Sequence, residues 1–365
     1  MSEPRFTPLR DRHEALGASF TDFGGWMMPV RYTSDLAEHH AVRQAAGLFD
    51  ISHMAEFEVA GAGAADFLDY ALAGRLSALA VGKAKYSLVL ADDGGIIDDV
   101  IVYRLADERF LVISNAGNRA DVAAALAARV TDGASVVDVS DDYALIAVQG
   151  PRAEEIVRAT PGLDIPELDD LKYYAWVSGS FAAAEVLVAR TGYTGEDGFE
   201  LLIPTGRADD LWDALLVAGE PFGLVPAGLA ARDTLRLEAG MPLYGHELSR
   251  DMKPAQAGLG RVVVDAKDSF VGKGETDPAA DAPVLVGLVA EGRRAGRAGY
   301  AVTDAEGRRI GEITSGALSP TLGHPIAMAF VSPEFAAGDR PLFIDVRGTQ
   351  IPATVTALPF YRRSK

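Results

Sequence analysis

Two adjacent carboxylates, Asp98 and Asp99, stand at the entry to a very apolar run that ends at Tyr103. Side chains alternate across a strand, so one carboxylate of the pair faces inward if the other faces solvent. An inward carboxylate beside valine and isoleucine would be partly desolvated, and its raised basicity would suit an amine or iminium partner. The alternative is that Gly94 and Gly95 form a turn and that both aspartates are solvated turn residues.

A loop with three glycines, two acids and a tyrosine, Arg190–Glu200, joins two further strand-like runs. Glycine lets the backbone approach a flat ligand closely, and Tyr193 can stack on such a ligand. The carboxylate of Glu200 can accept paired N–H donors from a heterocycle. This combination suits a pterin or purine ring. A glycine-rich hairpin loop with polar side chains is the alternative.

The usual catalytic and metal-binding motifs are absent from the sequence. The chain has no cysteine, which excludes disulfides, thiolate metal sites and a cysteine nucleophile. Gly61 and Gly63 could begin a dinucleotide fingerprint, but Asp66 occupies the position of the third glycine and would repel a pyrophosphate. His246 has no second histidine four residues later, and no Gly-x-Ser-x-Gly elbow occurs. We therefore expect no metal.

The composition is that of a folded globular protein, with 48% hydrophobic and 24% charged residues among 365. This length predicts two or three domains. The 34 basic and 52 acidic side chains give a net charge of −18, which argues against nucleic acid or an acidic membrane as partner. The first 29 residues contain no apolar run of signal-peptide length, so a cytoplasmic location is expected.

Up to about residue 265 the pattern mixes strands and helices. The runs that predict strands are Ala55–Ala60, Ala84–Leu90, Ile96–Leu105, Phe110–Ser114, Tyr143–Gln149, Phe181–Arg190 and Phe199–Ile203. The segments that predict helices are Asp35–Ala46 with Asp35 as its cap, Asn118–Val130, the residues after Gly150-Pro151, Ala208–Ala218 and the residues after Pro226-Ala227-Gly228. A strand, strand, helix succession occurs twice, which hints at two related α+β units.

Beyond this region the character of the sequence changes. Residues 266–283 are rich in Gly, Asp, Ala and Pro and predict a linker. Short strand-like runs bounded by turn residues follow at Val284–Ala290, Gly299–Thr303, Arg309–Thr314, Ala327–Ser332, Pro341–Val346 and Ile351–Leu358. The expected architecture is two interleaved α+β subdomains within residues 1–265, a linker at 266–283 and an all-β barrel at 284–365.

Seven segments resemble, in order and over nearly the whole chain, the T-protein of the glycine cleavage system, a family of tetrahydrofolate-dependent aminomethyltransferases. They are Phe23–Pro29, Phe49–Met54, Gly94–Tyr103, Arg190–Glu200, Ala227–Asp233, Gly311–Gly323 and Pro359–Arg362. The resemblance implies a folate-binding aminomethyltransferase fold with the folate in a central cavity. It implies tetrahydrofolate as co-substrate and the lipoylated H-protein, which carries the aminomethyl group, as partner. The products would be 5,10-methylenetetrahydrofolate, ammonia and dihydrolipoyl H-protein.

The resemblance also implies roles for individual residues. Asp99 matches the family's central carboxylate near the reacting folate nitrogens, where it would orient the folate and stabilise a cationic transition state or iminium. Glu200 would hold the pterin N–H groups, Arg232 would pair with Glu200 or contact the pterin, and Arg362 would meet the glutamate tail. The remaining folate-pocket residues would be Tyr86, Tyr103, Asn115, Tyr173 and Tyr193. Structural alternatives are an ion-pair network for Arg232 and core packing for Tyr86 and Tyr103.

Arg293, Arg294 and Arg297 form a dense basic cluster in this acidic chain. We hypothesise that they dock an acidic surface of the H-protein; a solvated loop is the alternative. Two other functions within the superfamily compete with aminomethyl transfer. One is a folate-dependent demethylase that takes carbon from a small molecule. The other is an assembly factor for iron–sulfur proteins, whose cysteine motif this chain lacks.

Overall fold

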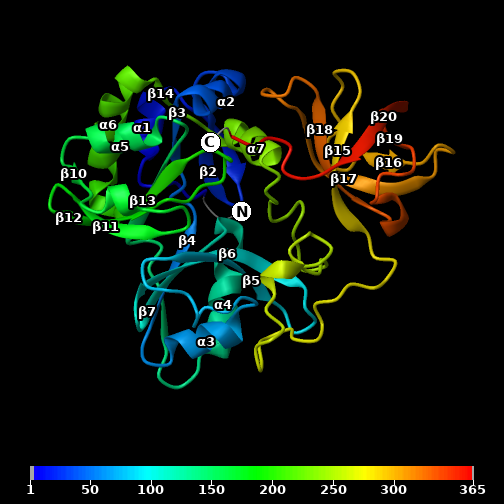
Figure 1. Ribbon diagram of the computed structural model, residues 1–365. Helices are drawn as coiled ribbons and strands as arrows, with labels where there is room; N and C mark the ends of the chain where they lie inside the picture. Colours follow the sequence, from blue (N-terminus) through cyan, green and yellow to red (C-terminus); the bar gives the residue numbers. More distant parts are fainter. Residues whose placement is uncertain (1–3, 364–365) are drawn as a thin grey trace. The chain divides into compact units, whose positions relative to one another are not determined.

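A computed structural model describes residues 4–363 and divides them into two compact units (Figure 1). The first unit contains the residues up to Ala71, Arg75–Ser87 and Asp99–Arg232. The second contains Leu72–Gly74, Leu88–Asp98 and the residues from Asp233 onward. The predicted fold class, a mixed α+β region followed by a β-barrel, is confirmed. The domain boundary near residue 265 and the linker remain predictions.

The first unit contains a seven-stranded sheet in the order β10-β11-β12-β13-β9-β3-β14. Its strands are antiparallel apart from the parallel pair of β14 and β3. They are β3 (Ala46–Asp50), β9 (Tyr143–Gln149), β10 (Leu163–Asp164), β11 (Trp176–Phe181), β12 (Ala184–Ala189), β13 (Gly198–Pro204) and β14 (Leu224–Pro226). The central strands β3 and β9 are almost continuously buried, which explains why their sequences do not alternate between apolar and polar residues. Helices α5 (Ala153–Ala159) and α6 (Ala208–Gly219) contribute to the same core, which includes Trp212.

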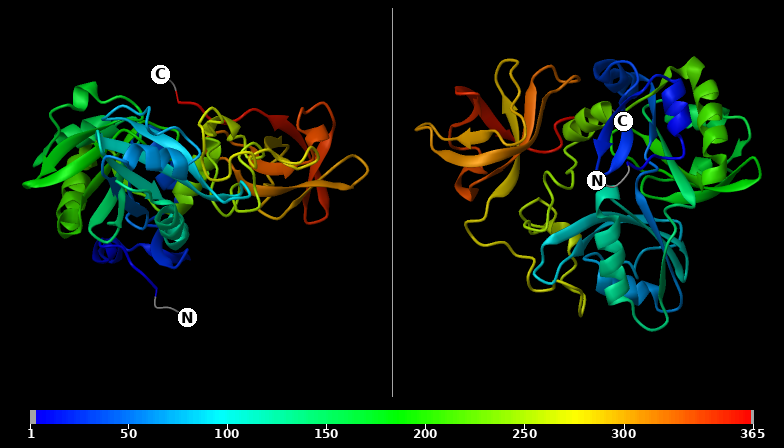
Figure 2. Two further views of the ribbon diagram at one scale, coloured as in Figure 1. Left: turned by 90° about the horizontal axis from the view of Figure 1, so that it is seen from below. Right: turned by 180° about the vertical axis from the view of Figure 1, so that it is seen from behind.

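A five-stranded sheet in the order β5-β6-β7-β4-β8 carries the carboxylate pair. Its strands are β4 (Ala55–Ala60), β5 (Ala84–Leu90), β6 (Ile96–Ala106), β7 (Arg109–Ser114) and β8 (Ser135–Asp138). Helices α3 (Ala64–Ala71) and α4 (Arg119–Arg129) lie against this sheet, as the view from behind in Figure 2 shows. The division into units assigns the end of β5 and the start of β6 to the second unit.

Short helices, one hairpin and several 3₁₀ turns complete the structure. They are α1 (Arg10–Ala15), the hairpin β1 (Ser19–Phe23) and β2 (Trp26–Arg31), α2 (Asp35–Gln44) and α7 (Leu229–Glu238). The 3₁₀ turns are η1 (Ala116–Asn118), η2 (Leu168–Asp170), η3 (Thr205–Arg207), η4 (Glu220–Phe222), η5 (Gly260–Val262) and η6 (Pro333–Phe335). Within residues 4–363 no helix combines the length and apolar character needed to cross a bilayer.

The second unit contains a closed barrel in the order β15-β18-β17-β16-β19-β20. Its strands are β15 (Val284–Ala290), β16 (Ala301–Thr303), β17 (Arg309–Leu318), β18 (Pro325–Val331), β19 (Leu342–Val346) and β20 (Thr349–Thr356). Leu288, Val302 and Ile313 are fully buried in its core. Closure leaves no unpaired sheet edge, which is how short strands with turn-rich connections form a stable domain.

Several expected bounds differ from the structure by a few residues, and two of the differences have a clear structural cause. Helix α2 ends at Gln44, not Ala46, and its cap is Ser34, whose Oγ accepts a hydrogen bond from Ala37 N at 3.4 Å. The chain then enters β3, a strand that the sequence did not reveal. The expected strand Phe181–Arg190 is part of a hairpin, because Ala182 and Ala183 adopt φ angles of 47° and 65° and turn the chain between β11 and β12.

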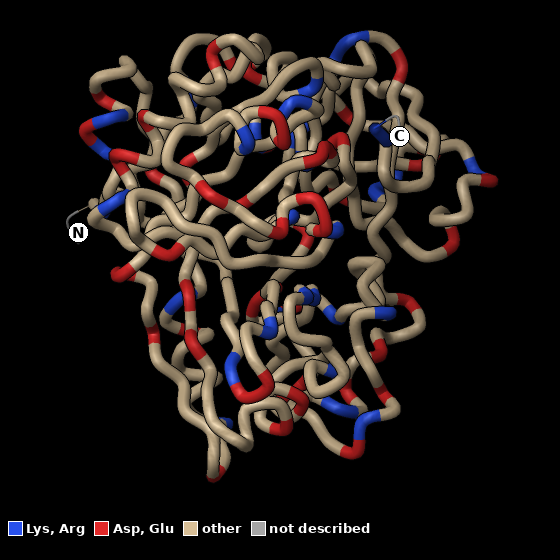
Figure 3. The backbone as a smooth tube through the Cα atoms, turned by 60° about the vertical axis from the view of Figure 1, so that its left-hand side comes forward, with Lys and Arg blue, Asp and Glu red and all other residues tan. Residues whose placement is uncertain are grey.

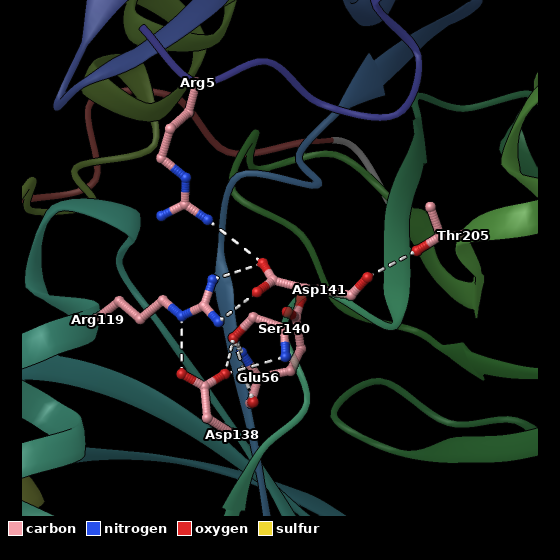
Figure 4. Close-up of polar contacts among 7 residues, drawn as sticks. All are labelled: Arg5, Glu56, Arg119, Asp138, Ser140, Asp141 and Thr205. Carbon is pink, nitrogen blue, oxygen red and sulfur yellow. Dashed lines mark hydrogen bonds and ion pairs between the residues drawn. The ribbon is translucent and has the colours of Figure 1, made fainter. Parts of the chain in front are cut away.

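A polar network lies where β8 leaves the five-stranded sheet (Figure 4). Arg119, at the start of α4, donates from Nε to Asp138 at 2.8 Å and from Nη1 and Nη2 to Asp141 at 2.8 and 3.1 Å. Arg5 donates to the same Asp141 at 3.3 Å. Ser140 Oγ donates to Asp138 Oδ1 at 2.6 Å and also accepts a β4 backbone N–H. The network therefore ties the N-terminal segment and α4 to the edge of the sheet.

Glu56 on β4 is buried beside this network without a partner for its carboxyl oxygen Oε2. Only 1% of the residue is exposed. Burial raises the pKa of Glu56 well above its ordinary value of 4.5, the charges of Asp138 and Asp141 add to this shift, and Arg119 opposes it. The folded protein therefore favours the neutral carboxyl, and ionising it costs stability.

The protein should lose stability through Glu56 as the pH rises. The pKa of Glu56 is higher in the folded protein than in the unfolded chain. Its contribution to the free energy of unfolding is therefore fully present below about pH 4.5 and is lost as the pH rises through the folded-state pKa. The Glu56→Gln side chain cannot ionise. The melting temperature of this variant minus that of the unaltered protein should therefore be larger at pH 8 than at pH 5. Differential scanning calorimetry at both pH values measures this difference.

The matched control is Glu58→Gln on the same strand, whose carboxylate forms an ion pair with the exposed Arg109. An ion pair of this kind contributes at most about 1 kcal/mol, so the control should show little change with pH. A melting-temperature difference for Glu56→Gln that is the same at pH 5 and pH 8 would contradict the assignment of a neutral buried carboxyl.

Candidate functional site

Asp99 on β6 is held by two neutral hydrogen-bond donors. Tyr86 on β5 donates its phenol hydrogen to Oδ2 at 3.0 Å, and Asn115 Nδ2, just after β7, donates to Oδ1 at 2.8 Å. The side chain of Asp99 is only partly exposed, whereas its neighbour Asp98 is fully buried. Burial raises the pKa of Asp99, and the two hydrogen bonds offset part of this shift. Asp99 is thus a carboxylate of raised basicity that remains accessible.

Glu200 on β13 is the second carboxylate of the site. Thr191 Oγ1 donates to Glu200 Oε2 at 2.5 Å, and the hydroxyl of the buried Tyr103 lies 3.1 Å from the same Thr191 oxygen. Because Thr191 gives its hydrogen to the carboxylate, Tyr103 donates to Thr191 and the three groups form a chain. Burial raises the pKa of Glu200, while Thr191, the charge of Arg232 and Tyr103 oppose the shift.

Arg232 on α7 supplies the positive charge near Glu200. Its guanidinium lies over the ring of Tyr193, 5.1 Å from the centroid, and 6.0 Å from the centroid of Phe49. Burial lowers the pKa of Arg232, and Glu200 opposes this effect. The buried atom Nη1 has no hydrogen-bond partner. A partly buried guanidinium with an unused, buried donor is the kind of group that a ligand satisfies.

The loop between Thr191 and Gly198 is shaped by side chains far away in the sequence. Gln149, fully buried on β9, donates to Thr191 O at 3.0 Å and accepts from Thr194 Oγ1 at 2.9 Å. A Cβ at Gly192 or Gly198 would lie 2.0 or 2.4 Å from the Gln149 side chain, so a larger residue at either position would displace this side chain from its hydrogen bonds. The backbone of the loop therefore packs directly on Gln149.

Two ion pairs fix the same loop. Arg43 on α2 donates from Nη1 to Thr194 O at 2.7 Å and to Glu196 Oε1 at 2.8 Å, with both charged side chains about 5% exposed or less. Arg190 pairs with Asp197 at 2.5 Å. A loop anchored in this way presents Tyr193 and Glu200 without needing a ligand to order it.

Tyr173 and Tyr174 occupy different environments. Tyr173, the expected pocket residue, is 53% exposed, and its ring meets that of Tyr174 in a T-shaped contact at 5.0 Å. Tyr174 adopts a φ of 58°, and burial together with the charges of Glu200 and Asp99 raises its pKa. Tyr174 is therefore a site residue that the sequence did not single out. Tyr173 and Tyr174 are neighbours of the same residue type. The left-handed backbone at Tyr174 distinguishes them, and this conformation cannot be predicted from the sequence.

The first unit thus brings together most of the predicted site residues: Asp99, Tyr86, Asn115, Tyr103, Tyr193, Glu200 and Arg232. Arg362 is exposed and belongs to the second unit, so its contact with a folate tail remains a prediction. Arg293, Arg294 and Arg297 are exposed in the barrel unit, where Arg297 donates to Gly316 O at 3.1 Å. Among residues 4–363 no group of three histidine, aspartate or glutamate side chains is arranged to hold a metal ion.

Two known family models match most of the chain. Residues 9–267 match the GCVT N-terminal domain. Residues 284–362 match the glycine cleavage T-protein C-terminal barrel domain. The second match begins at the first residue of β15 and includes all six barrel strands.

Relatives named as aminomethyltransferases resemble the chain over its full length. An aminomethyltransferase of Saccharopolyspora erythraea is 55% identical over 369 residues, which covers 100% of both chains. An aminomethyltransferase of Cutibacterium acnes is 56% identical over 374 residues, again covering 100% of both. The crystal structure of glycine cleavage system aminomethyltransferase T from Bartonella henselae superposes with a TM-score of 0.90 at 36% identity and covers 99% of each chain.

The hydrogen bond from Tyr86 should be visible in the titration of Asp99. It stabilises the charged carboxylate, so Tyr86→Phe should raise the pKa of Asp99 further above its ordinary value. Carbon-13 NMR of the aspartate carboxyl groups measures this shift, with Asp99→Asn used to assign the signal.

The control for this titration is Tyr143→Phe, which makes the same chemical change at the start of β9. An Asp99 signal whose midpoint is the same in Tyr86→Phe and in the unaltered protein would show that the phenol does not stabilise the carboxylate.

Proposed function

Because this chain belongs to the T-protein family of the glycine cleavage system, we propose that it is an aminomethyltransferase of glycine catabolism. Its reaction moves the methylene carbon of the aminomethyl group on the lipoyl arm of the H-protein to tetrahydrofolate. The products are 5,10-methylenetetrahydrofolate, ammonia and dihydrolipoyl H-protein. The relatives with this activity match the chain from end to end, which favours this function over demethylation of a small molecule.

The observation that carries the proposal is Asp99 held by Tyr86 and Asn115. In the reaction, one C–S and one C–N bond of the transferred carbon are replaced by two bonds to folate nitrogens. The carbon passes through a state with positive charge, and the two folate N–H protons end on sulfur and on ammonia. A partly buried carboxylate stabilises such a cation and can handle one of these protons. Its donors are neutral, so they do not cancel its charge.

The remaining site residues fit a reduced pterin as co-substrate. Glu200 can accept the paired N–H groups of the ring, and the unpartnered Nη1 of Arg232 can donate to it. Tyr193 lies beside Arg232 and offers a flat stacking surface. We assign no metal to this site. The lack of cysteine is compatible with a cytoplasmic place of action, which remains a prediction.

We assign the docking of the lipoylated H-protein to Arg293, Arg294 and Arg297. Figure 3 shows Asp and Glu distributed along the whole chain with Lys and Arg interspersed among them. Three arginines within five residues are therefore a local exception to a net charge of −18. Exposed charges of this kind steer association more than they add affinity.

Asp99→Asn should abolish turnover while leaving folate binding nearly intact. The amide keeps the size and hydrogen-bonding capacity of the side chain but removes its negative charge, so kcat should fall by about 100-fold or more. The assay supplies tetrahydrofolate and aminomethylated H-protein and measures methylenetetrahydrofolate. Folate affinity is measured separately by calorimetry and should change less than about threefold.

The control is Asp92→Asn, an exposed aspartate in the turn before β6. It should retain full activity. Two results would count against the proposal: no product above background with the unaltered protein, or normal turnover in Asp99→Asn.

Replacing Arg293, Arg294 and Arg297 together by alanine should weaken the encounter with the H-protein. We expect the KM for H-protein to rise about threefold or more at low ionic strength, with kcat unchanged, and the difference to shrink as salt is added. The matched control replaces Arg308, Arg309 and Arg340, three other exposed arginines of the barrel unit. An equal effect of both triple variants would point to net charge and not to a docking surface.

A further inference from the structure

A small cavity beside Arg232 is lined by Tyr32, Phe49 and Asp50, and Glu200 is not part of its wall. Its remaining wall is formed by Pro29 and by the residues that lead into α7. Its volume is about 10 Å³, which is room for the centre of one water molecule. All of its lining residues belong to the first unit. None of the functional assignments above uses this cavity.

Asp50 and Tyr32 are joined by a histidine to form a buried hydrogen-bonded chain. His13 Nε2 lies 2.8 Å from Asp50 Oδ2, and the hydroxyl of Tyr32 lies 2.9 Å from His13 Nδ1. Thr7 Oγ1 donates to Asp50 Oδ2 at 2.5 Å, and Ser52 N donates to Oδ1 at 2.9 Å. His13 and Asp50 are 1% and 6% exposed.

With a neutral His13, the hydrogen bonds among Asp50, His13 and Tyr32 fix where the hydrogens lie. An ionised carboxylate can only accept, so the proton of a neutral His13 is on Nε2 and points to Asp50. Nδ1 is then an acceptor and takes the hydrogen of Tyr32. Burial alone would raise the pKa of Asp50. His13, through its hydrogen bond and the positive charge it carries when protonated, and the hydrogen bonds from Thr7 and Ser52 lower the pKa below its ordinary value, in agreement with an ionised group. In this arrangement Tyr32 donates its only hydrogen to His13 and can offer the cavity only lone pairs.

The walls of the cavity are held in place by one further carboxylate. Glu38, 1% exposed, accepts from Tyr32 N with Oε1 at 2.8 Å and from Gly228 N with Oε2 at 2.9 Å. A Cβ at Gly228 would lie 2.4 Å from the carbonyl carbon of Val30, so no larger residue fits there. The space between Tyr32 and the start of α7 is therefore set by the fold.

We propose that this cavity binds one water molecule that accepts a hydrogen bond from Arg232 Nη1 and donates to Tyr32 and Asp50. The donor and the two acceptors match the hydrogen-bonding capacity of water, and three partners are typical of a buried water. An ammonium ion is a poor occupant, since the guanidinium on the cavity wall would repel it. The water gives the buried Nη1 of Arg232 a hydrogen-bond partner, and the second N–H of this atom remains for the pterin.

The water makes Tyr32, His13 and Asp50 positioning residues. They act on the pterin through Arg232, whose orientation they fix, and they take no part in the chemical step at Asp99. This inference rests on the proposed function, because it assumes that Arg232 contacts the folate. It assigns a role to the segments around His13 and Tyr32, which the folate contacts leave without one.

The first test compares Tyr32→Phe with Tyr143→Phe. Tyr32→Phe keeps the ring but removes the acceptor, so the dissociation constant for tetrahydrofolate, measured by calorimetry, and its KM should rise about five- to tenfold. The kcat should stay within about twofold, and Tyr143→Phe should match the unaltered protein. A Tyr32→Phe protein that melts at a lower temperature but binds folate normally would overturn the proposal, because the hydroxyl would then have a structural role only.

The second test is a crystal structure of the unaltered protein at a resolution that resolves single waters. We expect a water within about 3.2 Å of Arg232 Nη1 and of the Tyr32 hydroxyl, present with and without tetrahydrofolate. An empty cavity, or a folate atom in its place, would overturn the proposal. If the unaltered protein binds no tetrahydrofolate, the proposed function fails; if it binds but the water is absent, only this inference fails.

Discussion

Carboxylates that are partly or fully buried and held by neutral hydrogen-bond donors are the feature on which the site depends. Asp99 takes its hydrogens from a phenol and an amide, Glu200 from a threonine hydroxyl, and Asp50 from threonine, histidine and a backbone N–H. Uncharged donors stabilise the ionised carboxylate without neutralising its negative charge. The first unit therefore holds negative charge that is partly withdrawn from water and still able to attract a cation.

The composition makes this arrangement necessary as well as useful. With 52 acidic and 34 basic side chains, at least 18 carboxylates cannot have a cation of their own. The buried cations that do pair with acids, Arg43 with Glu196 in the first unit and Arg236 with Glu247 in the second, fix loops and helices. Arg232 is different, since a donor of its guanidinium has no partner. Arg43 and Arg236 thus form structural ion pairs, whereas the guanidinium of Arg232 remains available to a ligand.

Local patterns predicted most of the fold. The strands Ala55–Ala60, Ala84–Leu90 and Val284–Ala290 begin and end where the sequence placed them, because apolar runs bounded by turn residues carry their own boundaries. The prediction failed where the determining contact was distant or the turn had no residue signal. Strand β3 exists because Ala46–Asp50 pairs with β9, a hundred residues later. The turn at Ala182-Ala183 uses two alanines with positive φ, which no turn rule anticipates.

The site was predicted less evenly, for a physical reason. Residue types indicated Asp99 and Glu200, because a carboxylate at the entry to an apolar strand or beside a glycine-rich loop is unusual. The hydrogen-bond partners that hold the site could not be predicted from the sequence, because they are distant along the chain. Tyr103 and Thr191 are 88 residues apart, and Arg43 and Glu196 are 153 residues apart. The resemblance to a family supplied what spacing could not, but only for residues within its motifs. His13 lies outside those motifs, and only the folded chain brings it between Asp50 and Tyr32. A buried polar chain of this kind has no local signature, so its role follows from contacts alone.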